Sequence, residues 1–119
     1  MKSDNRFVPG KLHTVRPVAL AAGPVFTQNC RELTVLNTDH FGLVTQVEVG
    51  AMLVGKILNH HGAGPITRGQ EKGMFLYGGS TVILLLEKGR AALSPALLEA
   101  SARGEETPVK MGQPIGKAC

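Results

Sequence analysis

The residues whose types could do chemistry lie where two glycines meet a pair of hydroxyl side chains, in Tyr77-Gly78-Gly79-Ser80-Thr81. Both glycines can adopt backbone angles that other residues avoid, and the apolar run 82–86 could hold one flank of a strained junction. A serine after a strained peptide bond can attack the preceding carbonyl, so Ser80 could cleave the chain at Gly79. Gly-Gly-Ser-Thr is also common in tight turns, and these five residues alone favour that second interpretation.

The four histidines form no complete catalytic or metal-binding set by their spacing. His60 and His61 lie in a loop with glycine and proline and have no third ligand at regular spacing, which favours solvated side chains. His40 follows Asp39 and could be an oriented base, although a turn capped by Asp39 explains the pair as well. His13 lies in an alternating segment and is expected to be half-buried structure. We therefore predict no metal site.

The segment Ala51-Met52-Leu53-Val54 is similar to the Ala-Met-Lys-Met turn that carries biotin. Leu53 stands where the lysine would be, so the amine needed for attachment is absent. Lys56 is nearby but lies outside that register. A core strand is the better interpretation of this segment.

Composition describes a small single domain, residues 1–119. The 15 glycines and 7 prolines predict short strands and turns rather than long helices. The net charge of +4 is spread along the chain without a basic block, so no nucleic-acid partner is expected. A mild basic excess suits an anionic membrane surface somewhat better.

The cysteines and the apolar runs exclude further classes of protein. Cys30 and Cys119 are far apart and lack a CxxC partner, which argues against a disulfide framework and against zinc. No stretch approaches the roughly 18 apolar residues of a membrane span. The polar start, Met1–Asn5, is not a secretion signal.

Strands are the elements expected to position the glycine–serine junction. Residues 31–38 and 43–49 have strand composition and are joined at 39–42 by a hairpin connection. In the second strand Gln46 and Glu48 face away from the apolar positions. The run 82–86 predicts a buried strand, whereas residues 1–10 are expected to be a polar lead-in.

One short helix is expected near the C-terminus. Ser94 and Pro95 fit an N-cap followed by proline at the first helical position, and Gly104 fits a C-terminal stop. The side chains expected to face inward are Leu97, Leu98 and Ala102.

An internal repeat suggests the architecture. Gly69-Gln70-x-x-Gly73 and Gly112-Gln113-x-x-Gly116 have the same spacing, although glycine is frequent enough here for coincidence. Paired hairpins of this kind occur in small barrels built from two related halves. The predicted fold is mainly β, a small domain like the barrel-sandwich hybrid, with one short C-terminal helix.

Several segments resemble the pyruvoyl-dependent phosphatidylserine decarboxylases in order and spacing. The resembling segments are Gly10–Pro17, Asn29–Glu32, Phe41–Gly42, Val47–Ile57, Arg68–Gly73 and Phe75–Thr81. The resemblance extends from about Val8 to Gly116, nearly the whole chain. A Val-Gly-Ala…Val-Gly segment combined with Gly-Ser-Thr before an apolar strand is specific, whereas Gly-Ser-Thr alone is not.

The resemblance implies self-processing between Gly79 and Ser80, which would leave pieces 1–79 (the β-chain portion) and 80–119 (the α-chain portion). In the family the serine becomes an N-terminal pyruvoyl group, the covalent cofactor, which forms a Schiff base with the amine of phosphatidylserine. The electron-withdrawing group then allows carbon dioxide to leave, and phosphatidylethanolamine is released. The resemblance therefore identifies Ser80 and Gly79 as the catalytic residues.

Part of the family pattern has no counterpart in this sequence. Family members carry an activating Asp, and a His in a Tyr-His-x-x-His-like stretch, upstream of the region that matches this chain. They also carry membrane-inserting N-terminal helices. We therefore expect a C-terminal portion of a decarboxylase, from a truncated gene, a fragment or a split enzyme. Its expected partners are the missing N-terminal segment and a membrane surface. We expect it to lie peripherally on the cytoplasmic side of that membrane, and a homo-oligomer is possible. A non-catalytic binding or carrier-like module and an inactive remnant remain the alternatives.

Overall fold

The structure is a computed structural model that describes residues 2–8, 31–50, 57–60, 62–76 and 81–119, with side chains from residue 31 onward. Predictions that concern His13, Cys30, the segment 51–56, His61 and the stretch 77–80 lie outside the described residues. The mainly β class and the single short C-terminal helix are confirmed among the described residues.

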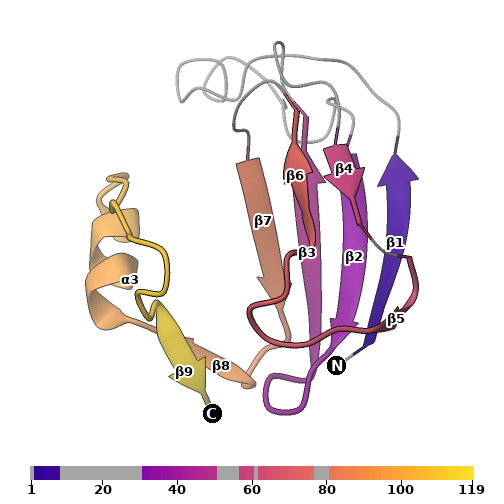
Figure 1. Cartoon of the computed structure of the whole chain (residues 1–119). Coiled ribbons are helices and arrows are strands. Elements are labelled where there is room, and N and C mark those ends of the chain that lie inside the picture. The colour runs from indigo at the N-terminus through magenta and orange to yellow at the C-terminus, as the bar shows by residue number, and fades with distance from the viewer. Residues whose placement is uncertain (1, 9–30, 51–56, 61, 77–80) are drawn as a thin grey trace.

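A five-stranded antiparallel sheet forms the body of the described protein, in the order β5-β1-β2-β3-β7 (Figure 1). Its strands are β1 (Lys2–Val8), β2 (Arg31–Asn37), β3 (Leu43–Val49), β5 (Gly64–Pro65) and β7 (Thr81–Leu86). The predicted hairpin of β2 and β3 is confirmed. The expected polar lead-in was wrong, because β1 pairs with β2 along its whole length although its sequence lacks a strand pattern.

The β2–β3 turn is capped by a threonine and not by Asp39. The Thr38 hydroxyl accepts a bond from the Phe41 N–H at 2.9 Å and donates to the Gly42 carbonyl at 2.7 Å. Gly42 has a φ of +68°, a conformation that glycine adopts without strain. The turn therefore needs no contribution from Asp39, and the side chain of His40 is exposed.

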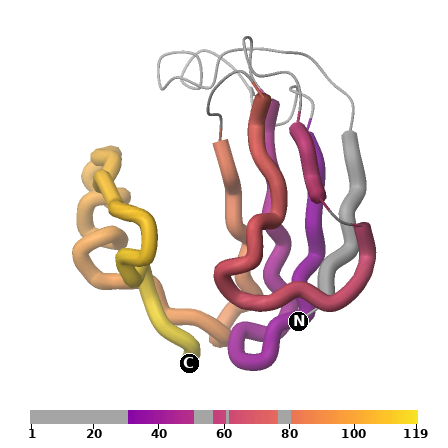
Figure 2. Tube along the Cα trace, viewed as in Figure 1, coloured from indigo at the N-terminus to yellow at the C-terminus, as the bar shows by residue number. Residues whose placement is uncertain are grey.

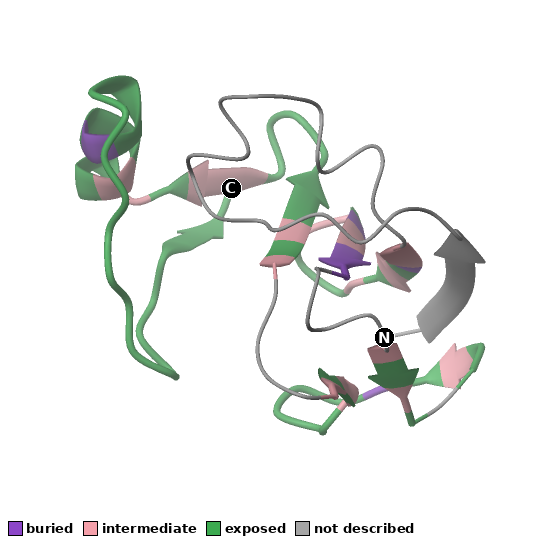
Figure 3. Cartoon of the chain, turned by 90° about the horizontal axis from the view of Figure 1, so that it is seen from above, coloured by how far each residue is buried: buried purple, intermediate pink, exposed green. Residues whose placement is uncertain are grey.

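The core lies on β3 and its neighbours. Val47 and Val49 are buried on one face of the sheet, while Thr34 and Glu48 are buried on the other. Figure 3 shows that the buried part of the ribbon is concentrated at β3, whereas the C-terminal region is mostly exposed. Because β3 lies between β2 and β7 in the sheet, its side chains have neighbours on both sides.

The strand predicted at 82–86 is confirmed as β7, but its predicted burial was wrong. Val82, Leu84, Leu85 and Leu86 are all exposed, Leu85 to 57%. β7 is an edge of the sheet, and no described element pairs with its outer side. An apolar run predicts a strand, but it does not show whether another element packs against that strand and buries it.

Two pairs of short antiparallel strands support the internal repeat; each pair is called a hairpin below, although β5 or α3 (Pro95–Ala102) lies between its strands. β4 (Ile57–Asn59) pairs with β6 (Gly73–Phe75), and β8 (Ala91–Leu93) pairs with β9 (Gly116–Ala118). In each hairpin the last glycine of the repeated motif opposes the last residue of the first strand. The segment from β5 to β6 crosses in front of the sheet, whereas β8 and β9 extend to one side (Figure 2).

The repeated turns are alike in detail. Gln70 Oε1 accepts a bond from the Thr67 N–H at 2.9 Å, and Gln113 Oε1 accepts one from the Lys110 N–H at 3.0 Å. The glycine before each glutamine has a positive φ, 79° and 80° respectively. Shared side-chain bonds and shared backbone angles show that the repeat is structural and not a coincidence of composition.

The helix α3 (Pro95–Ala102) begins after Ser94 and stops near Gly104, as predicted, although the Ser94 side chain makes no capping hydrogen bond. Gly104 has a φ of +73° and donates its N–H to the Ser101 carbonyl at 2.9 Å. The prediction that Leu98 and Ala102 face inward was wrong, since both are exposed and Ala100 is the buried residue. Leu98 is 52% exposed.

Candidate functional site

The two predicted site residues, Gly79 and Ser80, lie outside the described residues, but the segments on both sides of them are described. On one side β6 ends at Phe75, and on the other β7 begins at Thr81. The described residues Leu76 and Thr81 therefore flank the predicted junction.

The ladder between β3 and β7 holds the residues that follow Ser80. Thr81 is paired with Val49, and Val82 is paired with Glu48. Residues paired across an antiparallel ladder place their side chains on the same face. Glu48 and Val82 therefore lie side by side at the end of the sheet nearest to the predicted cleavage bond.

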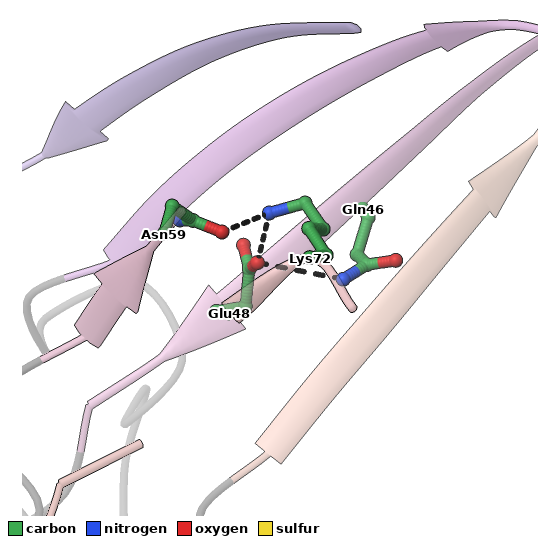
Figure 4. Close-up of polar contacts among 4 residues, drawn as sticks. All are labelled: Gln46, Glu48, Asn59 and Lys72. Carbon is green, nitrogen blue, oxygen red and sulfur yellow. Dashed lines mark hydrogen bonds and ion pairs between the residues drawn. The ribbon is translucent and has the colours of Figure 1, made fainter. Parts of the chain in front are cut away.

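A buried polar cluster occupies this end of the sheet (Figure 4). Glu48 is only 6% exposed. Its Oε1 forms an ion pair with Lys72 Nζ and accepts a bond from Gln46 Nε2 at 3.4 Å. Lys72 Nζ also donates to Asn59 Oδ1 at 2.5 Å. The cluster thus links β3 to the β4–β6 hairpin that covers it.

Two atoms of the cluster have no partner among the described residues. They are Glu48 Oε2 and Asn59 Nδ2, an acceptor and a donor. A cavity of about 110 Å³ lies beside Glu48; its lining also includes Lys72 and Val82. An ionised carboxylate with a spare oxygen can accept a further hydrogen bond or a proton. The cluster can hold the β4–β6 hairpin against β3, and Glu48 Oε2 can accept a hydrogen bond from a further polar group.

An apolar groove lies toward the other end of β7. Its volume is about 310 Å³, and it runs from the face of the sheet to the β8–β9 hairpin. The residues that line it include Leu36, Val44, Leu84, Leu86 and Ile115. The same face of the sheet is therefore polar beside Thr81 and apolar near Leu86.

The described histidines lie away from the predicted junction or at the surface. His40 is in the β2–β3 turn, whereas Thr81 pairs with the opposite end of β3, six residues along the strand at about 3.4 Å each, or roughly 20 Å. His60 is exposed and its Nε2 lies 3.1 Å from Glu71 Oε1. Among the described residues no group of three or more His, Cys, Asp or Glu side chains could hold a metal ion.

Sequence reasoning missed the cluster of Glu48, Lys72 and Asn59. Alternation in β3 correctly placed Glu48 on the face opposite Val47, but it did not indicate that the β4–β6 hairpin covers that face. Lys72 directly precedes the second glycine of the repeated motif, where the other copy has Ile115, so the motif gives no signal of an ion pair. The partner of Lys72 is 24 residues away, which no local pattern reveals.

Comparison with known proteins gives a consistent set of relatives. The family model described as phosphatidylserine decarboxylase matches residues 2–117. Phosphatidylserine decarboxylase proenzyme 2 of Clostridium acetobutylicum is 45% identical over 112 residues, covering 94% of this chain and 38% of that protein. The proenzyme of Chlamydia muridarum is 42% identical over 94% of this chain and 38% of its own length. That of Desulfitobacterium hafniense is 39% identical over 92% and 37%.

The chain therefore spans less than two fifths of the length of these relatives. No solved structure matches it. Within the described residues no helix has the length and apolar character needed to cross a membrane.

Proposed function

The chain belongs to the phosphatidylserine decarboxylase family, and on that premise we propose that it is the part of such an enzyme that cleaves itself between Gly79 and Ser80. The larger piece, 1–79, would be the β-chain portion, and the smaller piece, 80–119, the α-chain portion. Ser80 would then carry the pyruvoyl group that the decarboxylation needs.

The observation that supports this proposal most directly is the ladder between β3 and β7. All residues of β7 belong to the smaller piece, while β1, β2, β3 and β5 belong to the larger one. Backbone pairing from Val44–Leu86 to Val49–Thr81 would keep the two pieces together after the cleavage. The new N-terminal residue would be followed at once by a strand held in register, which suits a group that must be fixed in one place.

Chain cleavage itself uses only atoms of the protein, and one water molecule is consumed when the pyruvoyl group forms. The Ser80 hydroxyl attacks the Gly79 carbonyl carbon, the peptide C–N bond breaks, and the amide becomes an ester with a free amine on Ser80. A base removes the Cα proton of Ser80, the bond between its Cβ and Oγ breaks, and the Gly79 carboxylate leaves. The resulting dehydroalanine rearranges to an imine, and water replaces the nitrogen, which departs as ammonia. A terminal ketone remains.

We assign the activating base to the part of the decarboxylases that this chain does not match. Among the described residues, His40 lies in the turn at the opposite end of β3 from Thr81, and β3 is roughly 20 Å long. The pyruvoyl group would supply an electron-withdrawing carbonyl for decarboxylation of phosphatidylserine to phosphatidylethanolamine. The residues present here would contribute the held strand β7 and the polar end of the sheet.

The surface of the described protein is compatible with a large partner. Apolar side chains are exposed on β7, on α3 and in the segment before β9, among them Leu85, Leu98, Val109 and Met111. Exposed apolar surface of this extent is typical of interfaces. We propose that the remaining decarboxylase segment covers it, in an assembly peripheral to the cytoplasmic side of a membrane, with or without a second copy.

Intact mass measurement tests the proposal. The protein is mixed with the remaining segment of the Clostridium acetobutylicum relative, and its mass is followed with time. We expect the 12.6 kDa species to be replaced by pieces 1–79 and 80–119, the latter beginning with a pyruvoyl residue. Ser80→Ala should stay intact, whereas Ser101→Ala, a change at an exposed helical serine, should cleave as wild type does.

Persistence of the intact protein in that mixture would contradict the self-cleavage. Two alternatives would then remain, a non-catalytic binding or carrier-like module and an inactive remnant. Cooperative unfolding of the isolated protein would argue against a remnant. Formation of phosphatidylethanolamine from phosphatidylserine vesicles, lost in Ser80→Ala, would exclude the non-catalytic module.

A further inference from the structure

Glu48 is the meeting point of two segments that are ten residues apart in the sequence. Its backbone is paired with Val82 in the β3–β7 ladder, and its side chain holds the ammonium group of Lys72. Lys72 directly precedes β6, and Val82 is the second residue of β7. Both ends of the segment 73–81 are thus attached to one residue of β3.

The ion pair between Glu48 and Lys72 is poorly explained as a simple source of stability. The Lys72 side chain is only 14% exposed and that of Glu48 only 8%, so both charges have lost most of their water. Glu48 Oε2 and Asn59 Nδ2 have no partner among the described residues, and a buried polar group without a partner lowers stability. Apolar side chains at such positions are often equally stable or more stable. A role in fixing geometry accounts for the pair better.

We propose that Glu48 and Lys72 are positioning residues that hold the two ends of segment 73–81 together and thereby set the rate of self-cleavage. The inference rests on the proposed function, because that segment contains the Gly79–Ser80 bond. Closing a segment at both ends reduces the conformations available to it. Holding a nucleophile near its target in this way removes entropy from the barrier.

Lys72 acts through Glu48 and Asn59 and is not assigned a contact with the reacting atoms. The ammonium group donates to both side chains, one on β3 and one at the end of β4. A single lysine therefore fixes the start of β6 against the sheet. Arginine at position 72 could reach the same acceptors, whereas methionine would keep the apolar stem and lose both bonds.

Hydrogen exchange tests the positioning without any need for catalysis. The Ser80→Ala variant stays intact, and Lys72→Met is added to it. We expect the amides of Gly73–Phe75 and Thr81–Val82 to exchange at least tenfold faster, while those of Leu33–Val35 in β2 change less than threefold. Lys88→Met, at an exposed lysine in the turn after β7, is the matched control and should leave both sets unchanged. Unchanged exchange at 73–75 and 81–82 in Lys72→Met would overturn the proposal.

Cleavage kinetics in the mixture with the relative's segment test the consequence. Lys72→Met should slow cleavage at least tenfold, and Lys72→Arg should restore it to within threefold of wild type. Val47→Ala removes buried surface on the opposite face of β3 and controls for lost stability. It should slow cleavage less than threefold at an equal or larger loss of stability.

Equal slowing in Val47→Ala and Lys72→Met at matched stability would show that the pair is merely structural. Failure of the wild-type protein to cleave would instead contradict the proposed function. In that case the exchange measurement on the Ser80→Ala variant still decides whether Glu48 and Lys72 fix the two ends of the segment.

Discussion

Replacing Gly73 with alanine should disrupt the β4–β6 hairpin. An added Cβ would overlap the carbonyl oxygen of Leu58 and lie 2.9 Å from the Cα of Asn59. Both are backbone atoms, so neither can turn aside as the tip of a flexible lysine or glutamate would. Carbon atoms in contact are ordinarily about 3.5–4.0 Å apart, so the strands must separate by roughly 1 Å.

The loss of folding stability in Gly73→Ala follows from this separation of the strands. Overpacking in a fitted site destabilises by about 1–3 kcal/mol. A glycine-to-alanine change also reduces the conformational entropy of the unfolded chain, which stabilises the folded state by about 0.4–1 kcal/mol. The net loss is then on the order of 1–2 kcal/mol. With a urea slope of roughly 1–3 kcal/mol per M, the unfolding midpoint should fall by about 1 M.

Urea unfolding followed by circular dichroism provides the measurement. Gly62→Ala is the control, because an added Cβ there meets nothing within 4 Å, and its midpoint should stay within about 0.3 M of wild type. Gly116→Ala should resemble Gly73→Ala, since its Cβ would lie 2.5 Å from the Ala92 carbonyl oxygen. A wild-type midpoint for Gly73→Ala, or an equal loss for Gly62→Ala, would refute the reasoning.

Three further predictions concern the repeat, the core and the open edge. Gln70→Ala and Gln113→Ala remove equivalent turn bonds and should each lower the free energy of unfolding by about 0.5–1 kcal/mol in urea titrations. Val49→Ala empties a fully buried site and should lower it by about 1–3 kcal/mol by the same assay. Leu85→Ser alters a residue that is 57% exposed, so it should alter stability by less than about 1 kcal/mol yet reduce self-association in sedimentation velocity.

The sequence predicted those elements whose signals are local. Alternation predicted β2 and β3, and Ser94, Pro95 and Gly104 marked the two ends of α3. The repeated motif predicted two like hairpins, which share turn bonds and positive-φ glycines. These features succeed because caps and glycine angles depend on a few neighbouring backbone atoms.

Burial could not be predicted in the same way. β7 has an apolar sequence yet is exposed, and Glu48 is charged yet buried. Leu98 was expected to face inward and is exposed, whereas Ala100 is buried. In each case the outcome depends on which distant element covers the position, and periodicity marks a face without saying what lies against it.

By itself the sequence determined a mainly β protein, the strands β2, β3 and β7, and a glycine–serine junction placed directly before β7. Only the tertiary structure decided that β1 joins the sheet and that residues 72 and 82 both meet Glu48. The physical reason is that backbone preference acts within a few residues, whereas strand pairing and buried ion pairs join residues that are distant in sequence. The Glu48–Lys72 pair, 24 residues apart, exists only after the hairpin has folded over β3.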